Sequence, residues 1–269
     1  MNKITILGSG TSTGVPILGC NCKVCQSTEP RNKRFRSSAI LELKDQKRIL
    51  IDTTPDLRTQ LLNNKIDQLD AVIITHDHAD HTHGMDDLRP FGFKKESSLP
   101  VYTSESAAKD LTRKFPYIFD SNNYFKDKKI LGGGIPLLEL QTVGEGKEKI
   151  LGEEIDFLQL PHGHEDTLGI LHSKMAYIID CREIPLTSLK KLSDARLDLL
   201  IIDCLRPLPH QTHLHLELTL QYIAEIRPKN AVLTHMSHEW DYLDLTRELR
   251  RRGVKNTFPA IDGQCFLYS

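Results

Sequence analysis

Apolar residues fall in short runs along this chain, and many runs are rich in β-branched residues and end at polar or turn-forming residues. Such runs are typical of β-strands. In the first part of the chain they predict strands at 4–7, 39–43, 49–51 and 71–75. A second group, at 136–143, 155–160, 167–171 and 175–180, is separated by glycine-containing turns and predicts a second sheet.

Strands and helices alternate in the last third of the chain. We predict strands at 199–203 and 231–234, and helices at about 216–226 and 242–251. Gly253 is expected to end the last helix, so the basic run at 247–252 is interpreted as its solvated end, not as a nucleic-acid site. Earlier in the chain, residues 104–114 predict a helix capped by Ser104.

The size of the chain suits one domain. With 269 residues, 39% of them hydrophobic, the chain can bury a substantial core, and we expect a single domain over residues 1–269. The segment 131–152, rich in glycine and lysine, is interpreted as a turn or hairpin region and not as a domain boundary. We find no internal repeat or low-complexity tract.

Charge and hydropathy bear on location and partners. The apolar stretch 197–205 is short and contains Asp198 and Asp203, which argues against a membrane span. The amino terminus resembles a first strand more than a secretory signal, so a cytoplasmic location is expected. Since the formal net charge is −1 and no long run of one sign occurs, nucleic acid is a less favoured partner than a small molecule.

Three of the six cysteines, Cys20, Cys22 and Cys25, lie in one short segment. The other three are scattered, which is poor spacing for a disulfide framework. Three thiolates in one loop suffice for a structural zinc site if one more ligand arrives. The alternatives are three buried free thiols, or an iron–sulfur cluster that would need a distant fourth cysteine.

A glycine-rich segment at 8–16 follows the first predicted strand and superficially suggests a phosphate or dinucleotide loop. The dinucleotide fingerprint requires a helix to begin among the glycines. Here Pro16 and the cysteine segment follow instead, so the segment is weak evidence for such a loop.

The strongest chemical signal follows the predicted strand at 71–75. His76, His78, Asp80 and His81 are four potential ligands in six residues, placed where loop side chains can converge at a strand end. Imidazole suits zinc and related ions, and a carboxylate allows two cations to lie close together. We expect His76 and His78 to face one ion, and Asp80 and His81 to face the other. The alternative is a histidine-rich surface loop.

The HxHxDH pattern at 76–81 resembles the metallo-β-lactamase superfamily. That resemblance implies an α/β fold, a four-layer αββα sandwich, with a dinuclear metal site at the edge of its two sheets. It implies three later ligands, which we assign to His164, Asp180 and His235, with Asp180 bridging both ions. His164 is chosen over His162 because similar proteins place this ligand three residues after the proline.

In that assignment, His162 supports a ligand or faces the substrate. The resemblance also implies that Asp52 supports the ligand loop by hydrogen bonding and does not itself bind metal.

The glycine-rich start, CxCxxC, HxHxDH and THxSH together resemble the phosphodiesterases of the carbon–phosphorus lyase pathway and their relatives. This implies a structural zinc held by Cys20, Cys22, Cys25 and His238. His238 lies three residues after His235, so one short segment can serve both sites. A histidine near the substrate corresponds to His213, with His210 and His215 as competitors; His215 is better suited to a helix start.

We therefore expect a hydrolase with two zinc or manganese ions that attacks a small or cyclic nucleotide-like phosphodiester through a metal-bridging hydroxide. Asp80 and His213 are the expected catalytic residues. Hydrolysis of an ester, lactone or thioester is an alternative, as is processing of tRNA precursors, although no long basic arm is evident. A noncatalytic or redox role is a further alternative, but oxygen-reducing relatives usually carry glutamate where this chain has His78. The resemblance also suggests a homodimer.

Overall fold

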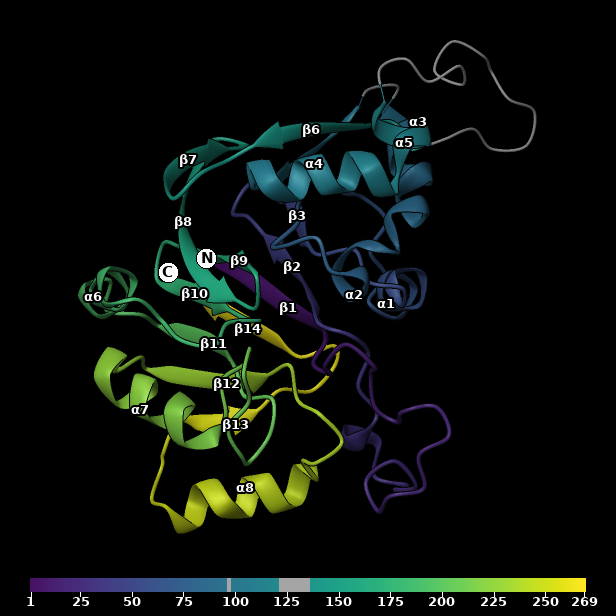
Figure 1. The fold of residues 1–269 in the computed structure, drawn as a ribbon. Coiled ribbons are helices and arrows are strands. Elements are labelled where there is room, and N and C mark those ends of the chain that lie inside the picture. Colours follow the sequence, from purple (N-terminus) through teal and green to yellow (C-terminus); the bar gives the residue numbers. More distant parts are fainter. Residues whose placement is uncertain (96–97, 121–135) are drawn as a thin grey trace.

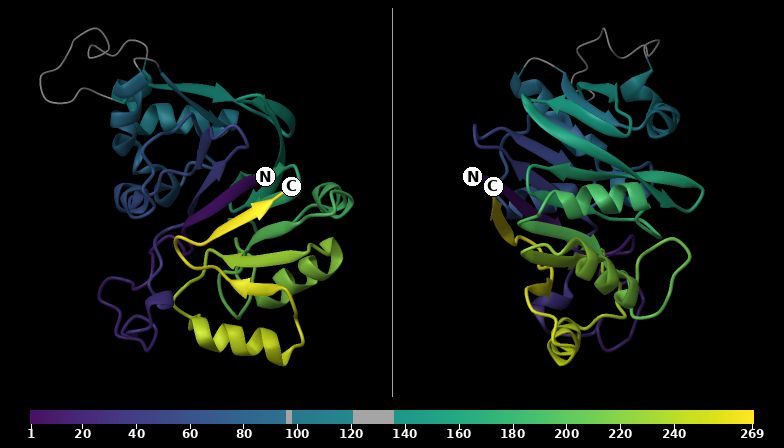
Figure 2. Two further views of the ribbon diagram at one scale, coloured as in Figure 1. Left: turned by 180° about the vertical axis from the view of Figure 1, so that it is seen from behind. Right: turned by 90° about the vertical axis from the view of Figure 1, so that its left-hand side faces the viewer.

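The computed structural model describes residues 1–95, 98–120 and 136–269. In these residues two seven-stranded β-sheets face each other, and helices cover the outer face of each sheet (Figure 1, Figure 2). This is the αββα sandwich of the metallo-β-lactamase fold, as the resemblance implied.

The first sheet has the strand order β14-β1-β2-β3-β4-β5-β6. Strands β14 to β3 run antiparallel to their neighbours, whereas β3 to β6 are parallel. The strands are β1 (Asn2–Gly8), β2 (Ser38–Glu42), β3 (Arg48–Ile51), β4 (Ala71–Ile73), β5 (Leu99–Thr103), β6 (Leu138–Thr142) and β14 (Cys265–Tyr268).

The second sheet has the order β13-β12-β11-β10-β9-β8-β7 and repeats this plan. Strands β7 to β10 are antiparallel, and β10 to β13 are parallel. The strands are β7 (Gly146–Ile150), β8 (Glu153–His162), β9 (Glu165–His172), β10 (Met175–Ile178), β11 (Leu199–Asp203), β12 (Asn230–Thr234) and β13 (Thr257–Pro259).

Helices form the two outer layers (Figure 1). Over the first sheet lie α1 (Leu57–Asn63), α2 (Ala79–Thr82), α3 (Arg89–Lys95), α4 (Glu105–Lys114) and α5 (Pro116–Phe119), with a 3-10 turn at Met85–Leu88. Over the second lie α6 (Leu186–Asp194), α7 (Leu216–Ile226) and α8 (Tyr242–Arg251). A further 3-10 turn, Pro30–Asn32, belongs to the segment that contains the three clustered cysteines.

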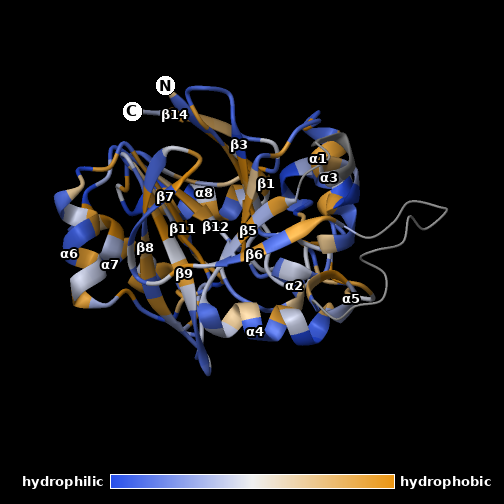
Figure 3. Ribbon diagram, turned by 90° about the horizontal axis from the view of Figure 1, so that it is seen from above, coloured by the Kyte–Doolittle hydropathy of each residue, from blue (hydrophilic) through white to orange (hydrophobic). Residues whose placement is uncertain are grey.

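The apolar strands explain the layering, because successive side chains of a strand point to opposite faces. In β3, Ile49 and Ile51 pack between the sheets, whereas Leu50 packs with Leu57 of α1 and Leu111 of α4. Both faces of the central strands are therefore buried, and these strands are mostly apolar, whereas the helices carry polar residues on their outer sides (Figure 3).

Most of the predicted elements are present. The helices at 216–226 and 242–251 have the predicted bounds, and the Ser104 side chain accepts a hydrogen bond from the Ala107 amide. One assignment was wrong: β6 completes the first sheet by pairing with β5, and the second sheet begins at β7. Residues 131–135 of the glycine-rich segment lie outside the described residues, and part of its remainder forms the β7–β8 hairpin. Within the described residues, no helix has the length and apolarity that a membrane crossing requires.

Candidate dinuclear metal centre

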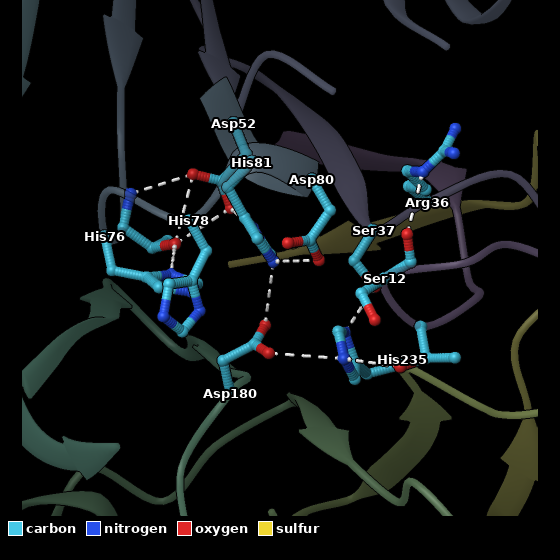
Figure 4. Close-up of polar contacts among 12 residues, drawn as sticks. Ser12, Arg36, Ser37, Asp52, His76, His78, Asp80, His81, Asp180 and His235 are labelled. Carbon is cyan, nitrogen blue, oxygen red and sulfur yellow. Dashed lines mark hydrogen bonds and ion pairs between the residues drawn. The ribbon is translucent and has the colours of Figure 1, made fainter. Parts of the chain in front are cut away.

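Polar side chains gather where parallel strands of both sheets end. Asp52 follows β3, the 76–81 segment follows β4, and Asp180 and His235 follow β10 and β12. Because the carboxyl ends of parallel strands meet at one edge of a sheet, these loops converge between the two sheets (Figure 4).

Three of these residues have left-handed backbone conformations. The φ angles are 63° for Asp52, 49° for Asp180 and 56° for His235. This conformation costs a residue other than glycine roughly 1 kcal/mol, and such strain persists where the surrounding structure imposes it. At each position the kink at the strand end brings the side chain into the site.

The first group of ligand atoms contains three histidines. Nε2 of His76 lies 3.0 Å from Nδ1 of His78, and Nε2 of His162 lies 3.2 Å from the same atom. These three nitrogens are close enough to share one metal ion.

The second group lies around Asp180. Nε2 of His81 is 3.1 Å from Oδ2 of Asp80 and 3.2 Å from Oδ2 of Asp180, while Nε2 of His235 is 3.2 Å from Oδ1 of Asp180. Burial by itself would raise the pKa of Asp180, but the neighbouring His235 and His81 rings bring it well below its usual value.

The two groups fit divalent metal ions. Because Nδ1 of His81 carries the ring hydrogen that is donated to Asp52, Nε2 of His81 does not donate to Oδ2 of Asp180, and among the described residues both atoms are buried without a hydrogen-bond partner. Buried polar atoms are rarely left in that state unless an ion or water is to be bound. Nitrogen and carboxylate donors in this arrangement suit zinc and similar ions. Asp180 also offers an oxygen within 4.8 Å of ligand atoms of His76 and His162 in the first group.

The rings of His81 and His162 are oriented by hydrogen bonds on the side away from the ligand groups. Nδ1 of His81 donates to Oδ2 of Asp52 at 2.8 Å, and this buried carboxylate also accepts from the amide of Thr75. Nδ1 of His162 donates to the carbonyl oxygen of Thr212 at 3.1 Å. Such contacts fix the tautomer that offers Nε2 to a metal. The hydrogen bonds predicted for Asp52 are therefore present.

The structure places His162, rather than the predicted His164, among the other potential ligands. Side chains two apart on a strand share a face, so His162 lies on the face that carries Leu160 into the core between the sheets. Gly163, with a φ of 60°, and His164 form the turn between β8 and β9. His164 is therefore exposed and remote from the ligand groups, where the His162 ring takes its place.

His213 lies beside both groups, as predicted. Its ring centroid is 4.9 Å from those of His162 and His235. Its Nδ1 donates to Oδ2 of Asp203 at 3.0 Å. Burial alone would lower the pKa of His213, but Asp203 raises it to about 8.

Of the two competing histidines, only His210 is beside His213, with a ring centroid 5.2 Å from that of His213. His215 is the N-cap residue of α7, as its helix-start assignment predicted, and His210 is exposed. Asp203 was not predicted as a site residue. The signal was present, because Asp203 and Asp180 each end a predicted apolar strand. Burial raises the pKa of Asp203 to about 6 against the opposing effect of His213.

A separate cluster combines the three cysteines of one loop with His238, three residues after His235. The Sγ atoms of Cys20, Cys22 and Cys25 lie 3.3, 3.5 and 3.5 Å from Nδ1 of His238, so the structure brings together the four predicted zinc ligands. Burial raises the pKa of Cys25 to about 11, whereas amide hydrogen bonds lower that of Cys22 to about 6. Such spacing of three thiols and an imidazole fits a structural zinc.

The fold and these ligand groups define the class of protein. A family model described as a beta-lactamase superfamily domain matches residues 47–236. The chain belongs to this superfamily and has the metallo-β-lactamase fold. Proteins with this fold are usually metal-dependent hydrolases. More narrowly, it is similar over its full length to a diphosphatase from the PhnP family, with 33% identity, a TM-score of 0.88 and 98% of that chain covered.

Curated relatives carry other names. An octanoyltransferase of Porphyromonas gingivalis is 37% identical over 88% of this chain and 46% of its own length. Coenzyme PQQ synthesis protein B of Acinetobacter baumannii is 30% identical over 62% of this chain and 58% of its own. The chain thus spans about half the length of the curated relatives it matches. A Zn²⁺-bound PqqB from Methylobacterium extorquens shares the fold, with a TM-score of 0.77 at 18% identity over 99% of this chain and all of that chain.

Proposed function

We propose that this protein is a metal-dependent phosphodiesterase acting on a small or cyclic nucleotide-like phosphodiester. The observation that carries the proposal is the place of His213, which lies against both ligand groups while its Nδ1 is held by Asp203. A phosphodiester needs its phosphoryl oxygens held and its leaving alkoxide protonated, and this arrangement provides groups for both tasks.

The first ion would be held by His76, His78 and His162, and the second by Asp80, His81 and His235, with Asp180 between them. When bound, two zinc or manganese ions activate water and neutralise charge on a phosphoryl group. Asp52 and Thr212 keep the rings of His81 and His162 oriented toward the centre.

His213 has one role in this scheme. Because its Nδ1 hydrogen is directed to Asp203, its Nε2 edge is available to a substrate oxygen. There it can hydrogen-bond the phosphoryl group or deliver a proton to the departing oxygen. Asp203 keeps the ring in position and stabilises its protonated form.

A second candidate substrate is a diphosphate. The similarity to a diphosphatase over nearly the whole of both chains favours it. Cleavage of a phosphoanhydride uses the same attack at phosphorus and the same handling of phosphoryl oxygens. The leaving group is then a phosphate, a better leaving group than an alkoxide, so this reaction would depend less on His213.

Acyl chemistry and tRNA processing are less well supported than these two reactions. The octanoyltransferase has a name that points to acyl chemistry, but this chain matches less than half of that protein. Similarity to the short form of human tRNase Z, with a TM-score of 0.65 at 15% identity, concerns the fold alone. Esters, thioesters and precursor tRNA therefore belong in the test as competing substrates.

The test is a substrate panel with purified, metal-loaded protein. It compares bis-p-nitrophenyl phosphate, a 2′,3′-cyclic nucleotide, a dinucleoside diphosphate, p-nitrophenyl acetate, an acyl thioester and precursor tRNA by kcat/KM. Preference for the first two supports the proposal, and preference for the diphosphate supports the second candidate. Asp180→Asn is the control for contaminating activity. If p-nitrophenyl acetate, the acyl thioester or the precursor tRNA had the highest kcat/KM, the proposal would be wrong.

A further inference from the structure

The glycine-rich segment, which failed the dinucleotide test, lies against the second ligand group. Oγ1 of Thr11 is 3.1 Å from Nε2 of His235, the nitrogen that also faces Oδ1 of Asp180. The Thr11 residue is only 8% exposed. Across the described ranges, His235 is the only hydrogen-bond partner of this hydroxyl.

The tautomer of His235 determines what this contact means. The Ser37 hydroxyl donates to the carbonyl oxygen of Gly10 at 3.0 Å, so its oxygen accepts from Nδ1 of His235 at 3.1 Å. The ring hydrogen is thus on Nδ1, and Nε2 offers a lone pair. In this structure the Thr11 hydroxyl donates to that lone pair.

Metal binding at His235 would remove this acceptor. If His235 gives its Nε2 lone pair to an ion, the Thr11 hydroxyl keeps its position but loses its partner. A buried hydroxyl without an acceptor is costly. The acceptors that become available at such a centre are the oxygens of an anion held by the ions, and for the proposed reaction these are phosphoryl oxygens.

The segment that carries Thr11 is held firmly. The amide and hydroxyl of Ser9 both donate to Oδ1 of Asp262, and the amide of Thr11 donates to the carbonyl of Met236. At Gly10 an added Cβ would lie 3.0 Å from the carbonyl oxygen of Arg34, a tight contact that glycine avoids. The hydroxyl is therefore fixed in position before any ligand binds.

We propose that the Thr11 hydroxyl is a substrate-binding group that donates a hydrogen bond to a nonbridging phosphoryl oxygen at the second ion. This inference rests on the proposed function and adds to the site a residue beyond its metal ligands and His213. A hydrogen bond from a fixed donor to a charged oxygen strengthens as negative charge builds up on the phosphoryl group.

The experiment measures anion binding as well as turnover. Metal-loaded wild type, Thr11→Val, Thr11→Ser and Thr13→Val are titrated with inorganic phosphate by calorimetry, and their metal content is determined by mass spectrometry. Valine keeps the shape of threonine without the hydroxyl, and serine keeps the hydroxyl. Thr13 is the matched control, because it lies in the same turn and its exposed hydroxyl donates to the carbonyl of Gly14.

We expect Thr11→Val to keep its metals and to weaken phosphate binding about tenfold, the loss of one hydrogen bond to a charged oxygen. Thr11→Ser should bind within about threefold of the wild type, and Thr13→Val should be unchanged. Unaltered phosphate binding in Thr11→Val overturns the proposal. Loss of metal from Thr11→Val also overturns it, because Thr11 would then only support His235.

Failure of the proposed function gives a different result. A wild type that binds phosphate and depends on Thr11 for it, but hydrolyses no phosphodiester, contradicts the phosphodiesterase and leaves the binding role intact. A wild type that hydrolyses phosphodiesters while Thr11→Val binds phosphate equally well contradicts only the role of Thr11.

Discussion

Nδ1 of His81 and Oδ2 of Asp52 are joined by a hydrogen bond of 2.8 Å, and both side chains are completely inaccessible to solvent. Burial raises the pKa of Asp52, although His81 opposes this effect. The strands β3 and β4 are parallel neighbours, and this pair joins the end of β3 to the 76–81 segment that follows β4. The orientation of one ligand therefore depends on a residue 29 positions earlier in the chain.

Asp52→Asn is expected to weaken metal binding about 10- to 100-fold, the usual effect of losing a carboxylate that orients a ligand histidine. An amide cannot accept from His81 and also preserve every contact with Thr75. Competition with a chromogenic chelator measures the affinity. Asp45→Asn, in an exposed turn, is the control and should bind metal as the wild type does. Equal affinities for all three proteins would contradict the supporting role.

His162→Ala is expected to lose one metal ion per chain, whereas His164→Ala should retain the full complement. The reason is that only the His162 ring reaches His78. Elemental analysis after dialysis against metal-free buffer compares the two variants directly. The reverse result would restore His164 as the ligand.

Cys22→Ser is expected to lower the metal content from about three ions per chain to about two, because serine replaces a thiolate ligand. Thermal unfolding should also begin at a lower temperature, since a structural metal contributes to folding free energy. Cys265→Ser is the control, because Cys265 is exposed and belongs neither to the cysteine cluster nor to the dinuclear site. Wild-type protein with only two ions would contradict the cysteine site.

His213→Ala is expected to lower kcat on the best phosphodiester substrate by about 100-fold, the lower end of the range for loss of a proton donor. Asp203→Asn should cause a smaller decrease, because the ring remains but loses its partner. His210→Ala is compared in the same assay and should change kcat less than threefold. A large effect of His210 with none of His213 would transfer the role to His210.

Asp262 is expected to make stability depend on pH. Burial raises its pKa to about 6, above the value near 4 of an unfolded chain, so the folded protein favours the protonated carboxyl. This contribution is present in full below about pH 4 and is lost as the pH rises through 6. Between pH 5 and 7.5 the free energy of unfolding should fall by about 1 kcal/mol more in wild type than in Asp262→Asn.

Urea denaturation of both proteins at each pH measures that difference. Taking the difference removes the pH dependence of the metal sites, which the two proteins share. Parallel curves for wild type and Asp262→Asn would show that the carboxyl titrates in the same way in both states.

Local pattern was sufficient wherever an element or site is built from residues close in sequence. The bounds of α7 and α8 follow from helical periodicity and end signals, and the four ligands at 76–81 are recognised by their spacing. Weak or short strands were not found: β13 spans Thr257–Pro259, and the exposed strand β7 is rich in lysine and glutamate. Such strands form because a neighbouring strand edge is available, which the sequence pattern does not reveal.

The sequence by itself indicated a metal centre, because ligand side chains at short fixed spacings have few other uses. It also indicated the fold, because the HxHxDH pattern at 76–81 resembles a superfamily that has the αββα sandwich. Only the tertiary structure decided between His162 and His164, because the register of the β8–β9 hairpin determines which side chain faces the core. Likewise Asp203, Ser37 and Thr11 join the site through contacts between distant segments, and these contacts exist only once the two sheets have packed together.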